Sequence, residues 1–278
     1  MKKIIQIIFF ISVTAFAQEL ELVNKFGDFS NASSFDIDLK GNFFISDIDE
    51  NTISKYDSTG EKIISIGGFG WKEAAFDEPT DLFTNTLSVY VADRNNNRIQ
   101  RFDKDLNFLS QYPDNESDKP IFGYPACISI SNLGFFFILD SDNFRILKYN
   151  LDGKFILEIG ANNSGNFALI EPKYFCTDHN SNIYVIDNKT IKIFDQYGMG
   201  TFSFNVSQEP DKIFIYSNKL LLIYKKKIIE YNLNNHKQIY YFKDFPELND
   251  KKITDAKLFD NSLFILTSEK LLKYKIIN

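Results

Sequence analysis

The chain of 278 residues contains only two cysteines and two histidines. With so few cysteines, its fold cannot depend on a framework of disulfide bridges. Neither histidine has the ligand spacing of a zinc site, and no Gly-x-Ser-x-Gly motif occurs that would place a nucleophile beside a general base. A zinc enzyme and a hydrolase with a Ser-His-acid triad are therefore both disfavoured.

Long apolar segments are also scarce, and the clearest one stands at the start of the chain. Two lysines precede an apolar run of 14 residues, Ile4–Ala17, which ends in the pattern Ala-x-Ala. The run is too short to span a bilayer comfortably, and the three features together are typical of a secretory signal peptide. We expect cleavage after Ala17, a mature domain over residues 18–278 without a transmembrane segment, and a secreted or periplasmic location.

What the sequence does contain is a recurring pair of short runs. An apolar run ends in a polar or aromatic residue, a turn follows, and a second run ends in an aromatic residue; Val89–Asp93 and the run up to Phe102 form the clearest copy. The ends of the first runs are 46, 47, 47, 37 and 43 residues apart, and they are Asp47, Asp93, Asp140, Asp187, Tyr224 and Thr267. A period of about 40–50 residues with short strands and polar turns is typical of four-stranded propeller blades.

Each copy leaves room for an innermost strand upstream and an outer strand downstream. The innermost strands are expected at Phe35–Leu39, Thr80–Phe83, Cys127–Ile130, Lys173–Cys176, Lys212–Ile215 and Ala256–Phe259. The outer strands are expected at Lys62–Ile66, Phe108–Tyr112, Phe155–Ile159, Thr201–Phe204 and Gln238–Phe242. The sixth unit stops without an outer strand, whereas residues 20–27 look like an outer strand without a blade. We therefore predict one all-β domain, a six-bladed β-propeller whose N-terminal strand completes the last blade and leaves the ring no open edge.

These units resemble the NHL repeat. Unit two, in which Phe76-Asp77-Glu78-Pro79 leads to the run from Val91 to Asp103, is a close match; units one, three and four match moderately, and five and six only in period and apolar pattern. The resemblance covers residues 20–278 and implies six blades. Members of the family include RNA- and protein-binding domains, a peptide-amidating lyase and secreted bacterial binding proteins, so the resemblance does not by itself imply one function. The lyase uses a His-rich metal centre, from which this chain departs.

The charge of the chain is unevenly distributed. Residues 18–210 carry 16 basic and 29 acidic side chains, a net charge of −13, whereas residues 211–278 carry 13 and 8, a net charge of +5. Such asymmetry can steer a charged partner, although a solvated edge around Lys225, Lys226 and Lys227 is the simpler interpretation. An acidic exported protein is a poor candidate for binding nucleic acid.

The two cysteines fall on adjacent innermost strands. Export would allow Cys127 and Cys176 to form a disulfide, but a distance between their Cα atoms above about 7 Å would forbid it. We expect two buried free thiols. The many aromatic side chains are expected to pack between neighbouring blades.

One face of the ring is the predicted binding face. The turns after the first runs should open on the same face as the long connections at 67–78, 113–124 and 160–171, and loops of this length commonly carry specificity. The candidate binding residues on this face are Asp47, Trp71, Asp93, Arg94, Arg98, Asp140, Arg145, Asp187 and Lys189.

These candidates also have structural interpretations. A ring of carboxylates could hold Ca²⁺, but an aspartate at the end of a strand more often accepts N–H bonds from the tight turn that follows. Arg98 and Arg145 would then be partners of those carboxylates. Trp71 is either a binding anchor or a plug over the core.

Two functions remain. The first is a non-catalytic binding module for a protein, peptide or glycan, with no cofactor. The second is a metal-dependent hydrolase or lyase; lactonases on related six-bladed rings use channel-facing Glu, Asn and Asp side chains, for which Glu78, Asp81, Glu171, Asp211 and Asp255 are the candidates here. The predicted starts of the innermost strands contain one lysine and only two acids, which favours the binding module: Ser34, Thr80, Ala126, Lys173, Asp211 and Asp255.

Overall fold

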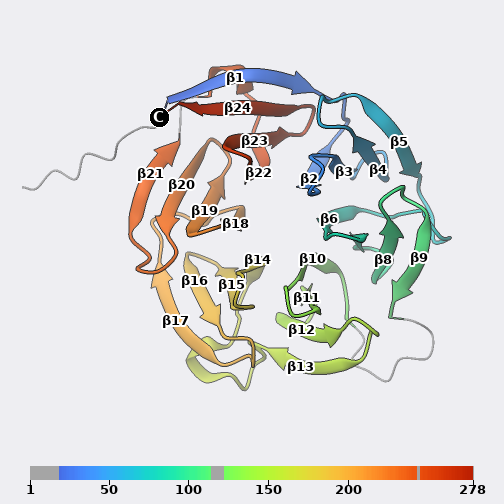
Figure 1. Cartoon of the computed structure of the whole chain (residues 1–278). Coiled ribbons are helices and arrows are strands. Elements are labelled where there is room, and N and C mark those ends of the chain that lie inside the picture. Colours follow the sequence, from blue (N-terminus) through green and yellow to red (C-terminus); the bar gives the residue numbers. More distant parts are fainter. Residues whose placement is uncertain (1–18, 114–121, 243–244, 278) are drawn as a thin grey trace, which may run out of the picture.

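Six four-stranded antiparallel sheets stand around a central axis in the computed structural model, which describes residues 19–113, 122–242 and 245–277 (Figure 1). In this part of the chain the only helical segments are two short 3₁₀ turns, Gly165–Phe167 and Pro246–Leu248. The predicted all-β, six-bladed propeller is confirmed. The predicted signal peptide lies outside the described residues.

Each blade runs outward from the axis in sequence order. The innermost strands are β2 (Ala32–Ile37), β6 (Pro79–Thr84), β10 (Pro125–Ile130), β14 (Pro172–Thr177), β18 (Lys212–Tyr216) and β22 (Ile253–Phe259). The second strands are β3 (Phe43–Asp47), β7 (Ser88–Asp93), β11 (Phe135–Asp140), β15 (Ile183–Asp187), β19 (Lys219–Tyr224) and β23 (Ser262–Thr267). The third strands are β4 (Thr52–Tyr56), β8 (Arg98–Asp103), β12 (Arg145–Asn150), β16 (Thr190–Phe194), β20 (Lys227–Asn232) and β24 (Leu271–Ile277).

The outer strands are β5 (Lys62–Gly67), β9 (Phe108–Tyr112), β13 (Phe155–Ile159), β17 (Gly200–Asn205), β21 (Gln238–Phe242) and β1 (Glu19–Phe26). The last of these comes from the other end of the chain. Strand β1 pairs antiparallel with β24, from Glu19 opposite Ile277 to Phe26 opposite Leu271, and the two strands lie side by side in Figure 1. The predicted closure of the ring is therefore present, and it covers the edge that β24 would otherwise expose.

The second and third strands form the buried centre of each blade. All but the first residue of β11 are buried, because both faces of the sheet pack against a neighbouring blade. Aromatic rings make many of these contacts: Phe43 of blade one and Phe264 of blade six are 5.1 Å apart between ring centroids. Each fully buried side chain of this size contributes roughly 1.5–3 kcal/mol of hydrophobic stabilisation.

Five of the six innermost strands begin earlier than the apolar pattern suggested, whereas β18 begins at the predicted Lys212. Strand β2 starts at Ala32 instead of Phe35 and ends at Ile37, so Leu39 lies in a turn. A register shift follows the first residue of five of these strands, which lets Pro79 pair with Asp93 while Asp81 pairs with Ala92. A proline is tolerated at the first position of a strand, and the bulge admits one extra residue.

All six innermost strands stand side by side about the axis and point toward the same face of the ring. Their starts adjoin, since the Ser33 hydroxyl donates to the carbonyl of Pro79, and so do their ends, since the N–H of Thr84 donates to Asp36. The ring therefore has two distinct faces. One face carries the turns between the second and third strands and the loops between blades. We call it the Asp-turn face. The other, with the turns between first and second strands (residues 38–42, 85–87, 131–134, 178–182, 217–218 and 260–261), is the leucine face.

Both cysteines are free thiols, as predicted, and they lie on β10 and β14 of adjacent blades. Burial raises the pKa of each thiol, so neither is a ready nucleophile. No helix within the described ranges has the length and apolar character needed to cross a membrane.

Candidate functional site

Asp93 shows what the aspartates of the Asp-turn face do. Its fully buried carboxylate accepts the N–H of Asp77 at 2.8 Å, both oxygens accept from the Asn96 side-chain amide, and Oδ2 accepts from Nε of Arg98 at 2.7 Å. Burial raises the pKa of this carboxyl group, and these hydrogen bonds act against that rise. Asp77 belongs to the loop that leads into the blade, whereas Asn96 and Arg98 follow the second strand. The carboxylate thus fastens the loop to the turn.

The other three aspartates make the same contact with the loop that leads into their own blade. Backbone N–H groups donate from Ser30 and Asn31 to Asp47, from Gly123 to Asp140, and from Ile170 and Glu171 to Asp187, at 2.7–3.1 Å. The predicted backbone donors from the following turn are present for Asp47, through Asp49 and Glu50. Among the described residues, the backbone donors to Asp93, Asp140 and Asp187 come from the incoming loop instead, so for these three the predicted donor was wrong. All four carboxylates lie below the protein surface.

Arg98 extends this anchoring to a whole loop. Its guanidinium donates to Asp93 and also to the carbonyls of Trp71, Lys72 and Ala75, at 2.7–3.0 Å. Its side chain is 9% exposed. Arg145 similarly pairs with Asp140 at 2.9 Å, and in blade four Lys192 pairs with Asp187 at 2.7 Å. The expected pairing of both arginines with the aspartates is present.

Trp71 is not a plug over the core. Its side chain is 74% exposed, and the neighbouring Phe69 is 68% exposed, with 6.0 Å between the two ring centroids. Because Arg98 holds the carbonyl of Trp71, this exposed aromatic pair stands on a fixed backbone. A rigid exposed aromatic pair can act as a binding anchor at low entropic cost.

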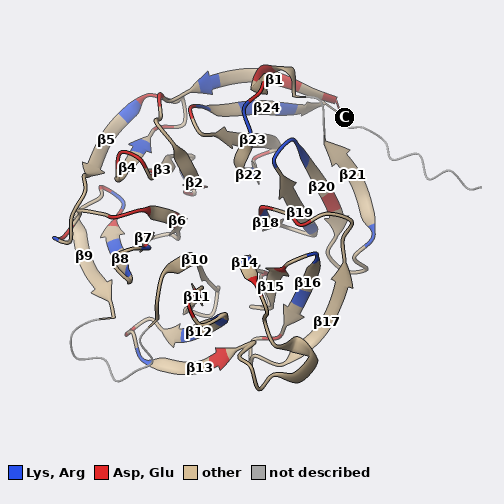
Figure 2. Ribbon diagram, turned by 180° about the vertical axis from the view of Figure 1, so that it is seen from behind, with Lys and Arg blue, Asp and Glu red and all other residues tan. Residues whose placement is uncertain are grey.

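Two basic candidates also reach solvent on this face. Arg94 pairs with Glu78 at 3.0 Å and lies over the ring of Tyr124. Lys189 is exposed and lines a hollow of about 510 Å³ together with the lysines of the turn between β19 and β20, which is blue in Figure 2. The solvent-accessible part of the predicted site therefore consists of Trp71, Arg94 and Lys189, supported by the buried Asp and Arg side chains.

The central channel is filled by one side chain from each blade. These side chains occupy the same position in the six innermost strands, immediately after the register shift where there is one: Ser34, Asp81, Cys127, Tyr174, Lys212 and Asp255. We call them the channel ring. The predicted channel positions were right for Ser34 and Asp255 and wrong by one residue for Thr80, Ala126, Lys173 and Asp211. In blades two, three and four the sequence gives no sign of the bulge that brings the next residue to the axis, and in blade five the strand begins one residue later, at Lys212.

Lys212 holds the channel ring together. Its ammonium lies 3.2 Å from Asp255, 4.0 Å from Asp81 and 2.8 Å from the carbonyl of Ser33. The hydroxyls of Ser34 and Tyr174 each donate to Asp81 at 2.7 Å. Burial and the nearby carboxylates raise the pKa of Tyr174, so its phenol keeps the donated proton. Both channel carboxylates are thus bonded to protein donors.

The two histidines stand apart from these groups. His179 is exposed in the turn between β14 and β15. His236, in the turn between β20 and β21, stacks on Phe202 and Phe204 with centroid distances of 4.9 and 5.3 Å, and burial lowers its pKa. Hydrophobic stacking accounts for His236 without a catalytic role.

Comparison with known proteins supports the repeat type. No family model matches the chain. The chain is 31% identical over 148 residues to Protein brain tumor of Drosophila melanogaster, a match that covers 51% of the chain and 14% of that protein. It is 32% identical over 138 residues to B-box type zinc finger protein ncl-1 of Caenorhabditis elegans, covering 48% of the chain and 16% of that protein. Both are NHL-repeat proteins, and the chain spans less than a fifth of their length.

Solved structures agree with the fold. A catalytically inactive virginiamycin B lyase variant from Staphylococcus aureus, determined with quinupristin, superposes with a TM-score of 0.65 at 12% identity and covers 93% of this chain and 100% of that one. A streptogramin B lyase gives a TM-score of 0.65 at 14% identity, covering 93% and 98%. At such identities the likeness concerns the fold alone.

Proposed function

We propose that the protein is a secreted or periplasmic, non-catalytic binding module that holds a protein, peptide or glycan on its Asp-turn face. The observation that carries this proposal is the position of Lys212 between Asp81 and Asp255. This ammonium already pairs with the carboxylates that a channel enzyme would present to a metal or substrate, and the Lys212 side chain is only 11% exposed.

The construction of the Asp-turn face supports a binding role. Its buried carboxylates and Arg98 fix the loop backbone, and the side chains of Trp71, Arg94 and Lys189 remain accessible. Fixing the backbone in advance lowers the entropy lost on binding. The similarity to two NHL-repeat proteins is consistent with a propeller that works through a surface.

The proposal is tested by presenting the mature protein to a displayed library of random peptides and to a glycan array. Binding should fall about tenfold or more for Trp71→Ala and by less for Arg94→Ala. Leu109→Ala is the matched control, since Leu109 is an exposed apolar residue on the outer strand β9. Ligands that bind Trp71→Ala as tightly as the unaltered protein would contradict the proposed face.

The alternative is a metal-dependent, lactonase-like hydrolase or lyase. It is retained because the solved structures with the same fold are lyases. Metal content should be measured, and the melting temperature recorded before and after addition of a chelator, alongside turnover of a panel of lactones and esters. A stoichiometric metal whose removal lowers the melting temperature, together with turnover abolished by Asp81→Asn or Asp255→Asn, would replace the binding module by the enzyme.

A further inference from the structure

The turns of the leucine face are shortest in blades five and six. They contain five residues in blades one and four, three or four in blades two and three, and only two in blades five and six. Asp260 and Asn261 both have positive φ, which matches a two-residue hairpin turn of type I′. The two blades that depart most from the repeat therefore leave space on this face.

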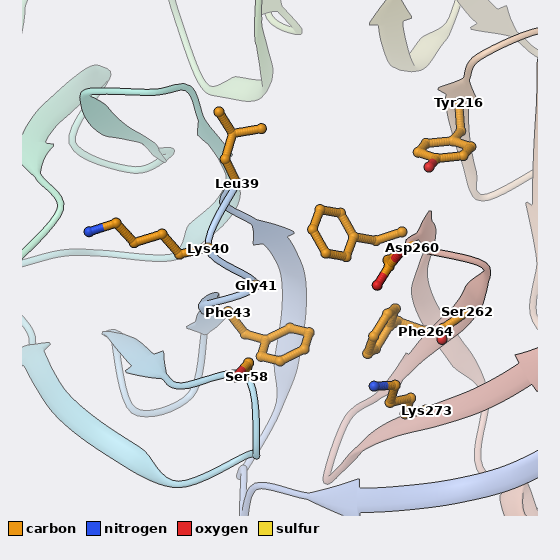
Figure 3. A pocket seen from close by; sticks show the side chains of 11 residues that line it. Leu39, Lys40, Gly41, Phe43, Ser58, Tyr216, Asp260, Ser262, Phe264 and Lys273 are labelled. Atoms are coloured by element: carbon orange, nitrogen blue, oxygen red, sulfur yellow. The ribbon is translucent and has the colours of Figure 1, made fainter.

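Hollows lie beside these short turns. One, of about 520 Å³, lies between blades six and one (Figure 3), and its apolar walls are Leu39, Phe43, Tyr216, Phe259 and Phe264. Another, of about 540 Å³, lies beside the short turn of blade five. A third, of about 450 Å³, shares Leu39 with the first hollow and Phe83 and Ile130 with the second. The three hollows thus follow one another around the mouth of the channel.

Apolar side chains separate the hollows and reach into solvent. Leu39 is 80% exposed, Leu87 73%, Leu133 57% and Tyr216 38%. Apolar side chains exposed together over several blades commonly mark an interaction surface. A small ligand would need only one hollow, whereas this arrangement extends over blades one, two, three and five.

The turn that carries Leu39 does not require a leucine. Asp38 accepts the N–H groups of Lys40 and Asn42 and the side-chain amide of Asn42. Blade four builds the same turn from Asp178, Asn180 and Asn182 with the same three contacts. There, His179 occupies the position that corresponds to Leu39. The leucine is therefore unexplained by the local structure.

The hollow between blades six and one also has a charge preference. Lys40 and Lys273 line it together with a single acid, Asp260. In Figure 3 the side chains of Tyr216, Phe264 and Lys273 lie on one side of the hollow and that of Leu39 on the other. Apolar walls with a surplus of positive charge suit a large apolar group that is followed by a carboxylate.

We propose that the leucine face is a second docking surface, which binds a polypeptide segment of a partner protein. A large apolar side chain of that segment enters the hollow between blades six and one, and an acidic side chain beside it faces Lys273, while Lys40, which extends outward from the opposite rim in Figure 3, adds positive charge further along the segment. The exposed side chains of Leu39, Leu87 and Leu133 contact the rest of the segment across blades one to three. This surface lies on the opposite side of the ring from Trp71, so it stands independently of the function proposed above.

The test uses a displayed library of random peptides selected on the immobilised full-length mature protein. The selected peptides should combine an aromatic or large aliphatic residue with a neighbouring Asp or Glu. Their affinity should fall about tenfold or more for Leu39→Asp and for Lys273→Glu, and remain unchanged for Trp71→Ala. The exposed Leu109 again provides a control, Leu109→Asp, which introduces the same charge on an outer strand. Circular dichroism checks that each variant is folded.

A second measurement does not depend on the loss of binding. A photoreactive phenylalanine analogue at position 39 should cross-link the selected peptides, and the same analogue at position 109 should not. The proposal is overturned if no peptide is enriched, if the enriched peptides are basic, or if they bind Leu39→Asp and Lys273→Glu as well as the unaltered protein. Peptides lost only with Trp71→Ala would support the Asp-turn face and reject this one.

Discussion

Blades one to four and blades five and six share one four-stranded plan but secure their incoming loops by different means. In the first four, a buried aspartate at the end of the second strand accepts N–H groups of the loop. In the last two, Tyr224 and Thr267 stand at this position. In these two blades, backbone groups make the contacts. The N–H of Asp211 donates to the carbonyl of Ile223, and the N–H of Ile253 donates to the carbonyl of Lys225.

The difference shows that the aspartate is not what makes a blade. Packing of apolar strands between neighbouring sheets stabilises all six, and the core of blades five and six is as apolar as the others. The aspartate adds a fixed loop conformation on one face. Blades without it have shorter turns on the other face, so the two groups of blades offer different surfaces on opposite sides of the ring.

The largest effect is expected where the two groups of blades meet, at the channel ring. Lys212→Met removes the ammonium that pairs with Asp255 and Asp81 and leaves only the more distant charge of Lys257 near these buried carboxylates, and we expect a loss of about 4 kcal/mol in the free energy of unfolding at neutral pH. Chemical denaturation at neutral pH measures the loss. Lys62→Met, an exposed lysine on β5, should change little; equal effects of the two variants would show that the ring contributes nothing.

The next effect compares one repeat position in two blades. Asp93→Ala leaves the buried guanidinium of Arg98 without its carboxylate and should cost about 3 kcal/mol. At the same position in blade five, Tyr224 has a buried hydroxyl that makes no hydrogen bond with any described residue. Tyr224→Phe should therefore be neutral or stabilise by about 1 kcal/mol. Thermal and denaturant unfolding of both variants decides this, and a comparable loss in each would remove the distinction between the two kinds of blade.

A smaller effect separates the loop anchor from the charge pair. Arg98→Lys keeps a cation beside Asp93 but cannot reach all three carbonyls of the loop, and we expect a loss of about 1–2 kcal/mol. Amide hydrogen exchange of residues 68–78 should become faster. Arg145, whose side chain is 19% exposed and which pairs with Asp140 and the more exposed Glu158, supplies the comparison, because Arg145→Lys should cost less than about 1 kcal/mol. Unchanged exchange in Arg98→Lys would show that packing alone fixes the loop.

Much of the fold could be read from the sequence because its signal is periodic. The anchors from Asp47 to Thr267 and the unpaired segment at residues 20–27 are enough to predict six blades and their closure through β1 and β24. The outer strands β9, β13 and β21 begin and end at the predicted residues. Each of these features depends on local patterns of apolar and turn residues.

The channel and the leucine face could not be predicted in this way. A single extra residue after Pro79 turns Asp81 instead of Thr80 toward the axis, and this bulge depends on pairing with β7. Leu39 looked like the end of a strand because an apolar residue followed Phe35 and Ile37 at the right spacing. Hollows depend on the relative lengths of turns from different blades, which no single unit contains.

The smallest effect concerns a charge reversal inside blade five. The position of Glu230 on its third strand is basic in four other blades, where it is Lys55, Arg101, Lys148 or Lys273. Glu230 is buried; one carboxylate oxygen is 3.2 Å from Lys219, and the other makes no hydrogen bond within the described ranges. Burial raises the pKa of this carboxyl group above its usual value of 4.5, and Lys219 acts against that rise.

Because the folded state binds this proton more tightly than the unfolded state, ionisation of Glu230 lowers the stability of the fold at neutral pH. Glu230→Gln should therefore raise the free energy of unfolding by about 1 kcal/mol at pH 7, and the gain should disappear as the pH falls toward 4 and the carboxylate becomes protonated. Melting temperatures at several pH values measure the gain, and Glu61→Gln, an exposed position, should show none. If Glu230→Gln instead lowers stability at pH 7, the pair with Lys219 is a net stabilising contact, and blade five has replaced the basic side chain of its neighbours by an ion pair of its own.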